Sequence, residues 1–139
     1  MINKTLRILI ADPQHFHRMK IERMFNRLDY YRIAPVQSLD ELLMLIDYSC
    51  EPFDGVVVNA DLAANRLNLH EFLLDSLHVR HALIYNDPVC GPLQDNVHAS
   101  RAALPSVCAI ERLMAAVEHS ASSGACAPLS QWRTQAQFG

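Results

Sequence analysis

The chain has 139 residues and a formal net charge of −3, with 12 Lys and Arg residues against 15 Asp and Glu residues. This length suits one domain with a sizeable core, and the small negative charge gives no general attraction to nucleic acid or to an anionic membrane. The longest apolar runs are far short of a bilayer span, and the N-terminus lacks the apolar core of a signal peptide. We therefore expect a cytoplasmic protein without a direct nucleic-acid or membrane partner.

The cysteines and histidines give no sign of a metal or redox site. No two of the 4 cysteines form a C-x-x-C pair, so reduced thiols that pack or lie at the surface are expected. The histidine pairs at residues 15 and 17 and at residues 78 and 81 do not converge on one site, whereas zinc ligands come in sets of three or four. We expect no metal and no cofactor.

The N-terminal part of the chain alternates strands and helices. Its predicted elements, in the order strand, helix, strand and helix, are residues 6–11, 14–28, 30–36 and 39–46. Pro35 favours an edge position for the second strand, because proline cannot donate a hydrogen bond to a neighbouring strand. The capping-box pattern from Ser38 to Glu41 marks the start of the second helix.

The first of these helices has an apolar and a basic set of side chains. Its apolar face is expected to consist of Phe16, Met19, Met24, Phe25 and Leu28. The basic residues fall mostly elsewhere on the helix and are Arg18, Lys20, Arg23 and Arg27. Such a basic face is either solvated, which is the commoner case, or an interaction patch.

A buried central strand is predicted around the consecutive valines Val56, Val57 and Val58. A short continuous run of β-branched residues suits a parallel sheet that is covered on both faces. Chemistry in such sheets lies just beyond the carboxyl ends of the strands. Here that end carries Asn59, followed by Asp61. The simplest role of Asn59 is a local hydrogen bond to the backbone of a turn.

The second half of the chain continues the alternation less regularly. The predicted elements, in the order helix, strand, strand and helix, are residues 69–77, 82–85, 102–104 and 106–119. Pro88, Gly91 and Pro92 oppose a long helix between the last two strands. One domain is expected over residues 1–120, followed by a flexible tail or linker over residues 121–139.

The alternation of strands and helices along the chain implies a doubly wound α/β fold with a five-stranded parallel sheet. Three motifs, in their order and spacing, resemble those of response-regulator receiver domains: the stretch 8–12, the pair Phe53-Asp54 and the pair Leu104-Pro105. The resemblance implies a flavodoxin-like sheet with strand order 2-1-3-4-5.

The resemblance spans residues 5–120 and implies where the receiver phosphorylation site would lie. Receivers phosphorylate an aspartate after strand three and hold Mg²⁺ with two acidic residues after strand one. A Ser or Thr after strand four, and a Lys before a Pro after strand five, contact the phosphoryl group. The corresponding positions are Asn59 for the acceptor, Asp12 and Pro13 for the acidic pair, Tyr85 or Asn86 for the Ser or Thr, and Leu104-Pro105 for the Lys-Pro pair. Only Asp12 and Pro105 match.

These departures remove the chemistry of a receiver for direct reasons. The amide of Asn59 is neutral and a poor nucleophile. Mg²⁺ needs hard oxygen ligands, and Pro13 leaves Asp12 as a single carboxylate that is expected to be partly solvated. Leu104 cannot replace an ammonium group that pairs with phosphate. We expect no catalytic residue, no metal site and no enzyme activity.

The resemblance implies a phosphorylation-independent signalling module in a bacterial two-component-type pathway, with a protein partner or a second copy of itself. The candidate interface borders a small-residue surface at Leu104, Ala115 and Ala116. Two alternatives stay open. The chain could be the N-terminal regulatory domain of a larger transcription factor or cyclic-dinucleotide enzyme, or a phosphoacceptor receiver that uses Asp61 or Asp12.

Overall fold

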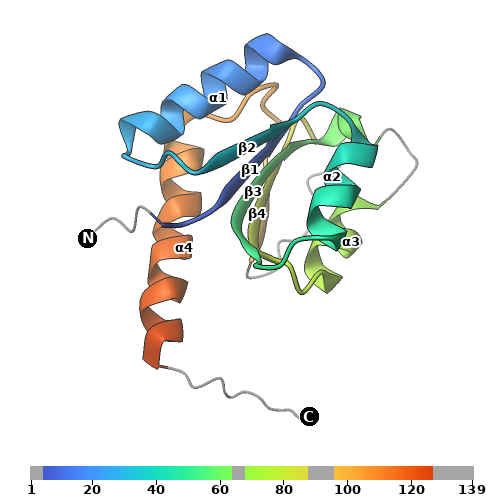
Figure 1. Ribbon diagram of the computed structural model, residues 1–139. Helices are drawn as coiled ribbons and strands as arrows, with labels where there is room; N and C mark the ends of the chain where they lie inside the picture. Colours follow the sequence, from blue (N-terminus) through green and yellow to red (C-terminus); the bar gives the residue numbers. More distant parts are fainter. Residues whose placement is uncertain (1–4, 64–67, 88–95, 127–139) are drawn as a thin grey trace.

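The computed structural model describes residues 5–63, 68–87 and 96–126, which build one parallel sheet with helices on both faces (Figure 1). The strands are β1 Ile8–Ala11, β2 Ile33–Val36, β3 Phe53–Asn59, β4 Val79–Tyr85 and β5 Val97–Ala99. The helices are α1 His15–Arg27, α2 Leu39–Asp47, α3 Leu69–Asp75 and α4 Val107–Cys126, with the short 3-10 helix η1 Ala60–Leu62 after β3. Neighbouring strands pair in parallel in the order β2-β1-β3-β4-β5. The order confirms the predicted doubly wound, flavodoxin-like α/β architecture.

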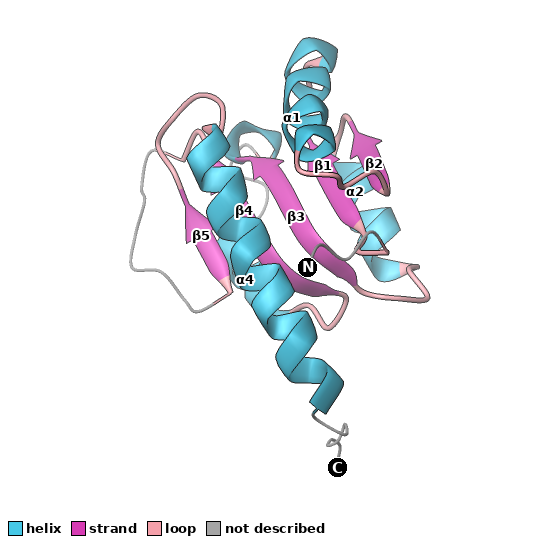
Figure 2. Cartoon of the chain, turned by 90° about the vertical axis from the view of Figure 1, so that its left-hand side faces the viewer, coloured by secondary structure: helices cyan, strands magenta, loops and turns pink. Residues whose placement is uncertain are grey.

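Each face of the sheet is covered by a pair of helices. α1 and α4 lie over one face, and α2 and α3 lie over the other (Figures 1 and 2). Successive residues of a strand point to opposite faces, so Val57 packs in the α1/α4 layer while Val56 and Val58 pack in the α2/α3 layer. All three valines are fully buried. The predicted central strand is confirmed, and burial on both faces accounts for its continuous apolar run.

The start of α2 follows the predicted capping box. Ser38 Oγ accepts a hydrogen bond from Glu41 N at 3.2 Å. The Glu41 carboxylate accepts in turn from Gln37 N at 3.1 Å, one residue before the N-cap. The N-cap bond of the capping box is therefore present, while the Glu41 carboxylate reaches the residue before the N-cap instead of the N-cap itself.

The buried face of α1 differs from the prediction. Its buried residues are Ile21 and Phe25, which lie one turn apart, whereas Phe16 and Met19 are 62% and 38% exposed. Side chains at i and i+4 lie above one another on a helix, so Phe16 shares an outer face with Lys20, whose Nζ lies 5.0 Å from the centroid of the Phe16 ring. The placement of Phe16 and Met19 in the core is wrong, and Ile21 takes that role.

The fifth strand is β5 rather than the predicted residues 102–104. β5 pairs in parallel with the middle of β4, and its first residue, Val97, is buried. Residues 102–104 form bends instead, and the backbone oxygen of Ala102 accepts a hydrogen bond from Asn86 N at 2.8 Å. The prediction fails because a strand of 3 residues is too short to show a periodic pattern.

Other boundaries also differ from the sequence prediction, among them the start of β4, at Val79 rather than at residue 82. α4 continues to Cys126 instead of ending near His119, and β2 begins at Ile33 rather than at residue 30. The predicted helix break at residues 88–92 and the rest of the expected tail, residues 127–139, lie outside the described residues. Within the described part of the chain, no helix combines the length and the hydropathy needed to cross a membrane.

Candidate functional site

The carboxyl ends of three neighbouring strands bring Asp12, Asn59 and Tyr85 together. Asp12 follows β1, and Asn59 and Tyr85 are the last residues of β3 and β4. The register pairs Ala11 with Val58 and Asn59 with Tyr85, so the three side chains lie at one edge of the sheet. All three are buried, and Asp12 is 0% exposed. The expectation of a partly solvated Asp12 is wrong, because the phenol of Tyr85 and the start of α1 cover the carboxylate.

Both oxygens of the Asp12 carboxylate have partners within the chain. Oδ1 accepts a hydrogen bond from Gln14 N at 2.7 Å. Oδ2 accepts one from Asn59 Nδ2 at 3.0 Å and one from the Tyr85 hydroxyl. His17 Nδ1 also lies 3.2 Å from Oδ2. Oδ2 therefore has three partners and Oδ1 has one, and because Asp12 is 0% exposed, neither oxygen is open to a metal ion or a substrate from solvent.

The pKa values of Asp12 and Tyr85 follow from this network. Burial on its own would raise the pKa of Asp12, but the hydrogen bonds from Tyr85, Gln14 N, Asn59 and His17 favour the charged form and bring the pKa below its usual value of 3.8. Burial raises the pKa of Tyr85, and the hydrogen bond to Asp12 and the charge of that carboxylate raise it further. At neutral pH the pair is therefore a carboxylate held by a neutral phenol, and neither group is available as a nucleophile or base.

The amide of Asn59 uses both of its ends. While Nδ2 donates to Asp12, Oδ1 accepts from Asp61 N at 2.9 Å, in the turn that opens η1. The predicted turn hydrogen bond is confirmed. A carboxylate at residue 59 would accept the Asp61 bond but could not donate to Asp12. The geometry therefore suits an asparagine at residue 59 and opposes an aspartate there.

Asn86 adds two further hydrogen bonds to this network, on the side nearer to solvent. Its Nδ2 lies 3.2 Å from Asn59 Oδ1 and 2.8 Å from Asp61 Oδ2. Its φ of 57° lies in the left-handed region, which asparagine tolerates better than most residues. Asp61 is exposed but already accepts this hydrogen bond from Asn86. Asn86 thus ties the turn after β3 to the end of β4.

Leu104 and Pro105, the remaining positions implied by the resemblance, lie in the loop before α4. Leu104 is half-buried and packs against the α1/α4 layer, and Pro105 is buried. Of the other two candidate interface residues, Ala115 is exposed and Ala116 is half-buried on α4. Leu104 is thus part of the packing between the last loop and the sheet, and Ala115 is the most accessible of the three. Pro13 is exposed beside Asp12 and contributes no side-chain donor or acceptor.

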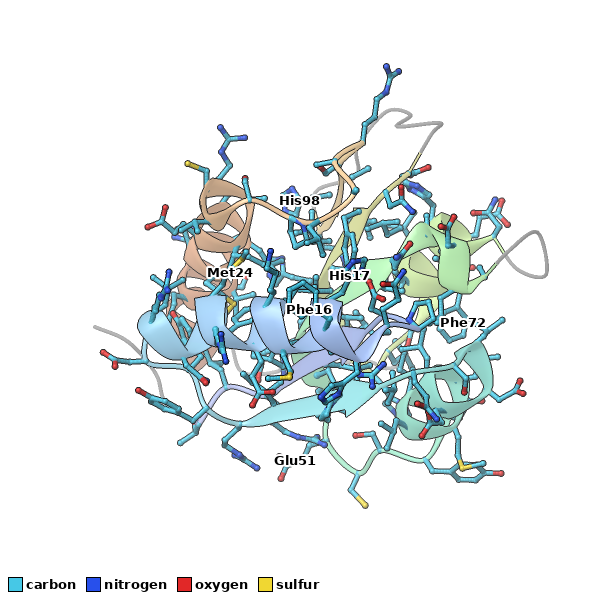
Figure 3. The ribbon with its side chains drawn as sticks, turned by 90° about the horizontal axis from the view of Figure 1, so that it is seen from above. Phe16, His17, Met24, Glu51, Phe72 and His98 are labelled. Carbon is cyan, nitrogen blue, oxygen red and sulfur yellow. The ribbon has the colours of Figure 1, made fainter. Side chains whose placement is uncertain are left out.

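Three contributors to the site come from α1 and the turn before it, and none of them was predicted there, since His17 and Arg18 entered only as half of a histidine pair and as part of a basic helix face. Gln14 N and His17 contact Asp12, and Arg18 Nη1 donates to the backbone oxygen of Asp12 at 2.6 Å. These residues could have been found from their position in the sequence. In a βα unit, the first turn of the helix lies above the acidic residue that ends the preceding strand. Figure 3 labels His17 on α1, in the view from above.

A second buried carboxylate lies just beyond β4 and was also not predicted. His70 Nε2, on α3, lies 2.8 Å from Asp87 Oδ2. Asp87 N donates to the backbone oxygen of Ser100 at 3.0 Å. Asp87 therefore connects α3 to the loop after β5. Among the described residues, neither this pair nor the Asp12 network belongs to a group of three or more His, Cys, Asp or Glu side chains that could hold a metal ion.

Comparisons with known proteins do not assign the chain to a family. No protein-family model matches the chain, no curated protein is significantly similar to it, and no solved structure matches it significantly.

Proposed function

We propose that the chain is a phosphorylation-independent pseudo-receiver, a signalling module that acts by binding protein in a bacterial two-component-type pathway. The main support is the Asp12 carboxylate, whose oxygens are occupied by Gln14 N, Asn59, Tyr85 and His17. The strand order β2-β1-β3-β4-β5 supports the proposal, because a receiver with this order would hold its metal and phosphoryl group at the same strand ends. Such a module keeps the receiver fold, but its own side chains fill the phosphorylation pocket. It can then act only by binding other molecules at its surface.

The chemistry of the pocket supports the loss of phosphoryl transfer. A phosphoacceptor must present an anionic oxygen to the phosphorus atom, and Asn59 presents an amide that is already bonded at both ends. Mg²⁺ takes an octahedral set of oxygen ligands and usually keeps several waters. No such space is left at a carboxylate that is 0% exposed. Leu104 packs against the α1/α4 layer and brings no positive charge to the site.

The direct test is to incubate the protein with a small-molecule phosphodonor and Mg²⁺ and to follow its intact mass. We expect no phosphoryl adduct. An acid-stable, base-labile adduct, as an acyl phosphate is, would overturn the proposal and favour the alternative of an active phosphoacceptor. Asp61→Asn and Asp12→Asn would then show which carboxylate carries the group, because only the variant that lacks the acceptor would lose the adduct.

The binding half of the proposal needs its own experiment. A tagged, full-length chain is used to capture proteins from its source cells, and each captured candidate is then purified and titrated against the chain. We expect one such partner, or the chain itself, to bind with the same affinity before and after treatment with the phosphodonor. A change in affinity that depends on the phosphodonor would contradict a phosphorylation-independent module.

One observation favours the alternative of a regulatory domain within a larger protein. α4 continues to Cys126, past the predicted end of the domain, and its last turns project beyond the sheet (Figure 1). A helix that leaves a domain in this way is suited to lead into another segment of structure. Sequencing the complete transcript of the gene tests this alternative, which requires an open reading frame that continues past Gly139.

A further inference from the structure

The two faces of the protein carry opposite charge. α1 has Arg18, Lys20, Arg23 and Arg27 against the single acid Glu22. α2 and α3 have no Lys or Arg, and their acidic residues are Asp40, Glu41, Asp47, Glu71 and Asp75. α1 lies on one face of the sheet, and α2 and α3 lie on the other (Figure 1). Positive and negative side chains are therefore unevenly distributed between the two faces, although the net charge of the chain is small.

The outer side of α1 forms a basic stripe, which we define as Phe16, Lys20, Arg23 and Arg27. The spacings of 4, 3 and 4 residues place these side chains on one line along the helix. All four are exposed, and Lys20 lies over the ring of Phe16. A solvated face would need no large apolar side chain, so a stripe that begins with an exposed phenylalanine has the composition of a contact surface.

A groove of about 510 Å³ lies on the other face, at α3 and the end of α2. We call it the acidic groove; its lining includes Asp47, Glu71, Phe72, Asp75, Leu77 and His78. Leu77 is 92% exposed, and Tyr48, which follows Asp47 in the sequence, is 82% exposed. Figure 3 shows Phe72 between α2 and α3. The groove therefore combines negative charge with large apolar side chains that face solvent.

Each surface contains a pair of like charges on one helix face. Arg23 and Arg27 are i,i+4 neighbours on α1, and Glu71 and Asp75 are i,i+4 neighbours on α3. Among the described residues, none of these four side chains forms an ion pair. Like charges at this spacing destabilise a helix. The two pairs share one spacing, so a helix bearing the first can lie along a helix bearing the second with both charges matched.

We propose, building on the protein-binding function above, that the chain associates head to tail, with the basic stripe of one copy docked in the acidic groove of the next. The occupant is a second copy because this chain carries a surface of matching charge, spacing and apolar content. The two surfaces lie on opposite faces of the sheet, so each copy uses one of them toward each neighbour. Such a heterologous contact does not close as a two-fold dimer does. Association therefore grows with concentration and weakens with salt.

The test is the mass distribution of the full chain by sedimentation velocity, from micromolar to millimolar concentration and at low and high ionic strength. One variant neutralises the groove, Glu71→Gln with Asp75→Asn, and another neutralises the stripe, Arg23→Gln with Arg27→Gln. A matched control, Glu111→Gln with Arg112→Gln, changes two exposed residues of α4. Circular dichroism verifies that each variant is folded.

The expected result is a wild-type mass that rises with concentration and falls with salt, an unchanged control, and an association constant about tenfold lower for each neutralised variant alone. Mixing the two variants should restore association but stop it at one-to-one pairs, because the intact stripe of one fits only the intact groove of the other. A wild-type chain that stays monomeric, or a mixture that does not pair, would overturn the inference. So would association that survives in both variants but is lost in Ala116→Glu, which would place the interface on α4. None of these outcomes depends on phosphodonor labelling, so failure of the interface and failure of the phosphorylation-independent function are distinguishable.

Discussion

The Tyr85 hydroxyl donates a hydrogen bond to the Asp12 carboxylate, although the two residues are 73 positions apart and their strands are not neighbours. β3 lies between β1 and β4, so the phenol reaches across the end of the central strand. The ring therefore covers the Asp12 carboxylate at the end of the central strand, which in the proposed pseudo-receiver takes the place of a metal ion and a phosphoryl group. The strand order of the sheet makes this contact possible, and the contact supports the proposed loss of phosphorylation chemistry.

Tyr85→Phe should destabilise the protein by about 1–3 kcal/mol, because a buried carboxylate loses a donor without gaining water. The same substitution should raise the pKa of Asp12, since Tyr85 supplies the largest hydrogen-bond contribution that lowers it. Urea unfolding and a carbon NMR titration of the Asp12 carboxyl measure the two effects. Tyr31→Phe, on an exposed tyrosine, is the control. An unchanged free energy of unfolding and an unchanged pKa would show that the Tyr85 contact has no energetic role.

Asp12 should also contribute to acid unfolding. Its folded-state pKa lies below 3.8, so its stabilising contribution is fully present above that pH. The contribution is lost as the pH falls further through the folded-state pKa, because the unfolded chain takes up a proton first. Comparing the free energy of unfolding of the wild type and Asp12→Asn across this acid range isolates the effect. The variant should be less stable at neutral pH and have a shallower acid slope; equal slopes would contradict the lowered pKa.

His81 should make stability sensitive to mild acid. Burial lowers its pKa below 6.5, the charges of His98 and Arg80 lower it further, and Asp54 opposes them. His81 Nε2 contacts Ser120 Oγ at 2.8 Å. Because the unfolded chain binds a proton more readily, stability should fall as the pH drops below 6.5 toward the folded-state pKa.

The measurement for His81 is the free energy of unfolding between neutral and mildly acidic pH. His81→Gln should remove most of this dependence, while His119→Gln, at an exposed residue of α4, should preserve it. If the two variants show the same dependence as the wild type, the buried His81 is not its source.

Asn59→Asp alone should not restore efficient phosphorylation. The change replaces a 3.0 Å hydrogen bond from Asn59 Nδ2 to Asp12 with two facing carboxylates, which raises the pKa of the pair and destabilises the fold. The triple change with Pro13→Asp and Leu104→Lys supplies the second acidic ligand and a cation, so it should be labelled faster by a phosphodonor. Equal labelling rates for the single and the triple variant, followed by intact mass, would contradict this account of the pocket.

The sheet could be predicted from the sequence because its pattern is local. Val56, Val57 and Val58 are buried on both sides, and the run is readable without any tertiary knowledge. The turn at Asn59 and Asp61 is equally local, since the side chain bonds to a backbone group two residues on. β5 could not be predicted, because its 3 residues are held by pairing with β4 rather than by their own pattern.

The sequence predicted where the residues of the Asp12 network lie, but not the hydrogen bonds between them. The resemblance placed Asp12, Asn59 and Tyr85 at one edge of the sheet, but their hydrogen bonds depend on a tyrosine long enough to cross β3 and on His17 from α1. Such contacts arise from tertiary packing, which overrides a residue-by-residue comparison. Phe16 is a related case, because an apolar residue on a helix with charged neighbours fits either face until the packing of Ile21 and Phe25 selects one.

The most direct measurement of the central claim is a Mg²⁺ titration of the isotope-labelled protein, followed by the amide shifts of residues 12 and 59. If the carboxylate of Asp12 is fully engaged by Gln14 N, Asn59, Tyr85 and His17, these shifts should change no more than those of a generic acidic surface such as Glu71 and Asp75. Saturable shifts at residues 12 and 59 with submillimolar metal would show that the pocket opens to Mg²⁺ and would contradict a closed, phosphorylation-independent site.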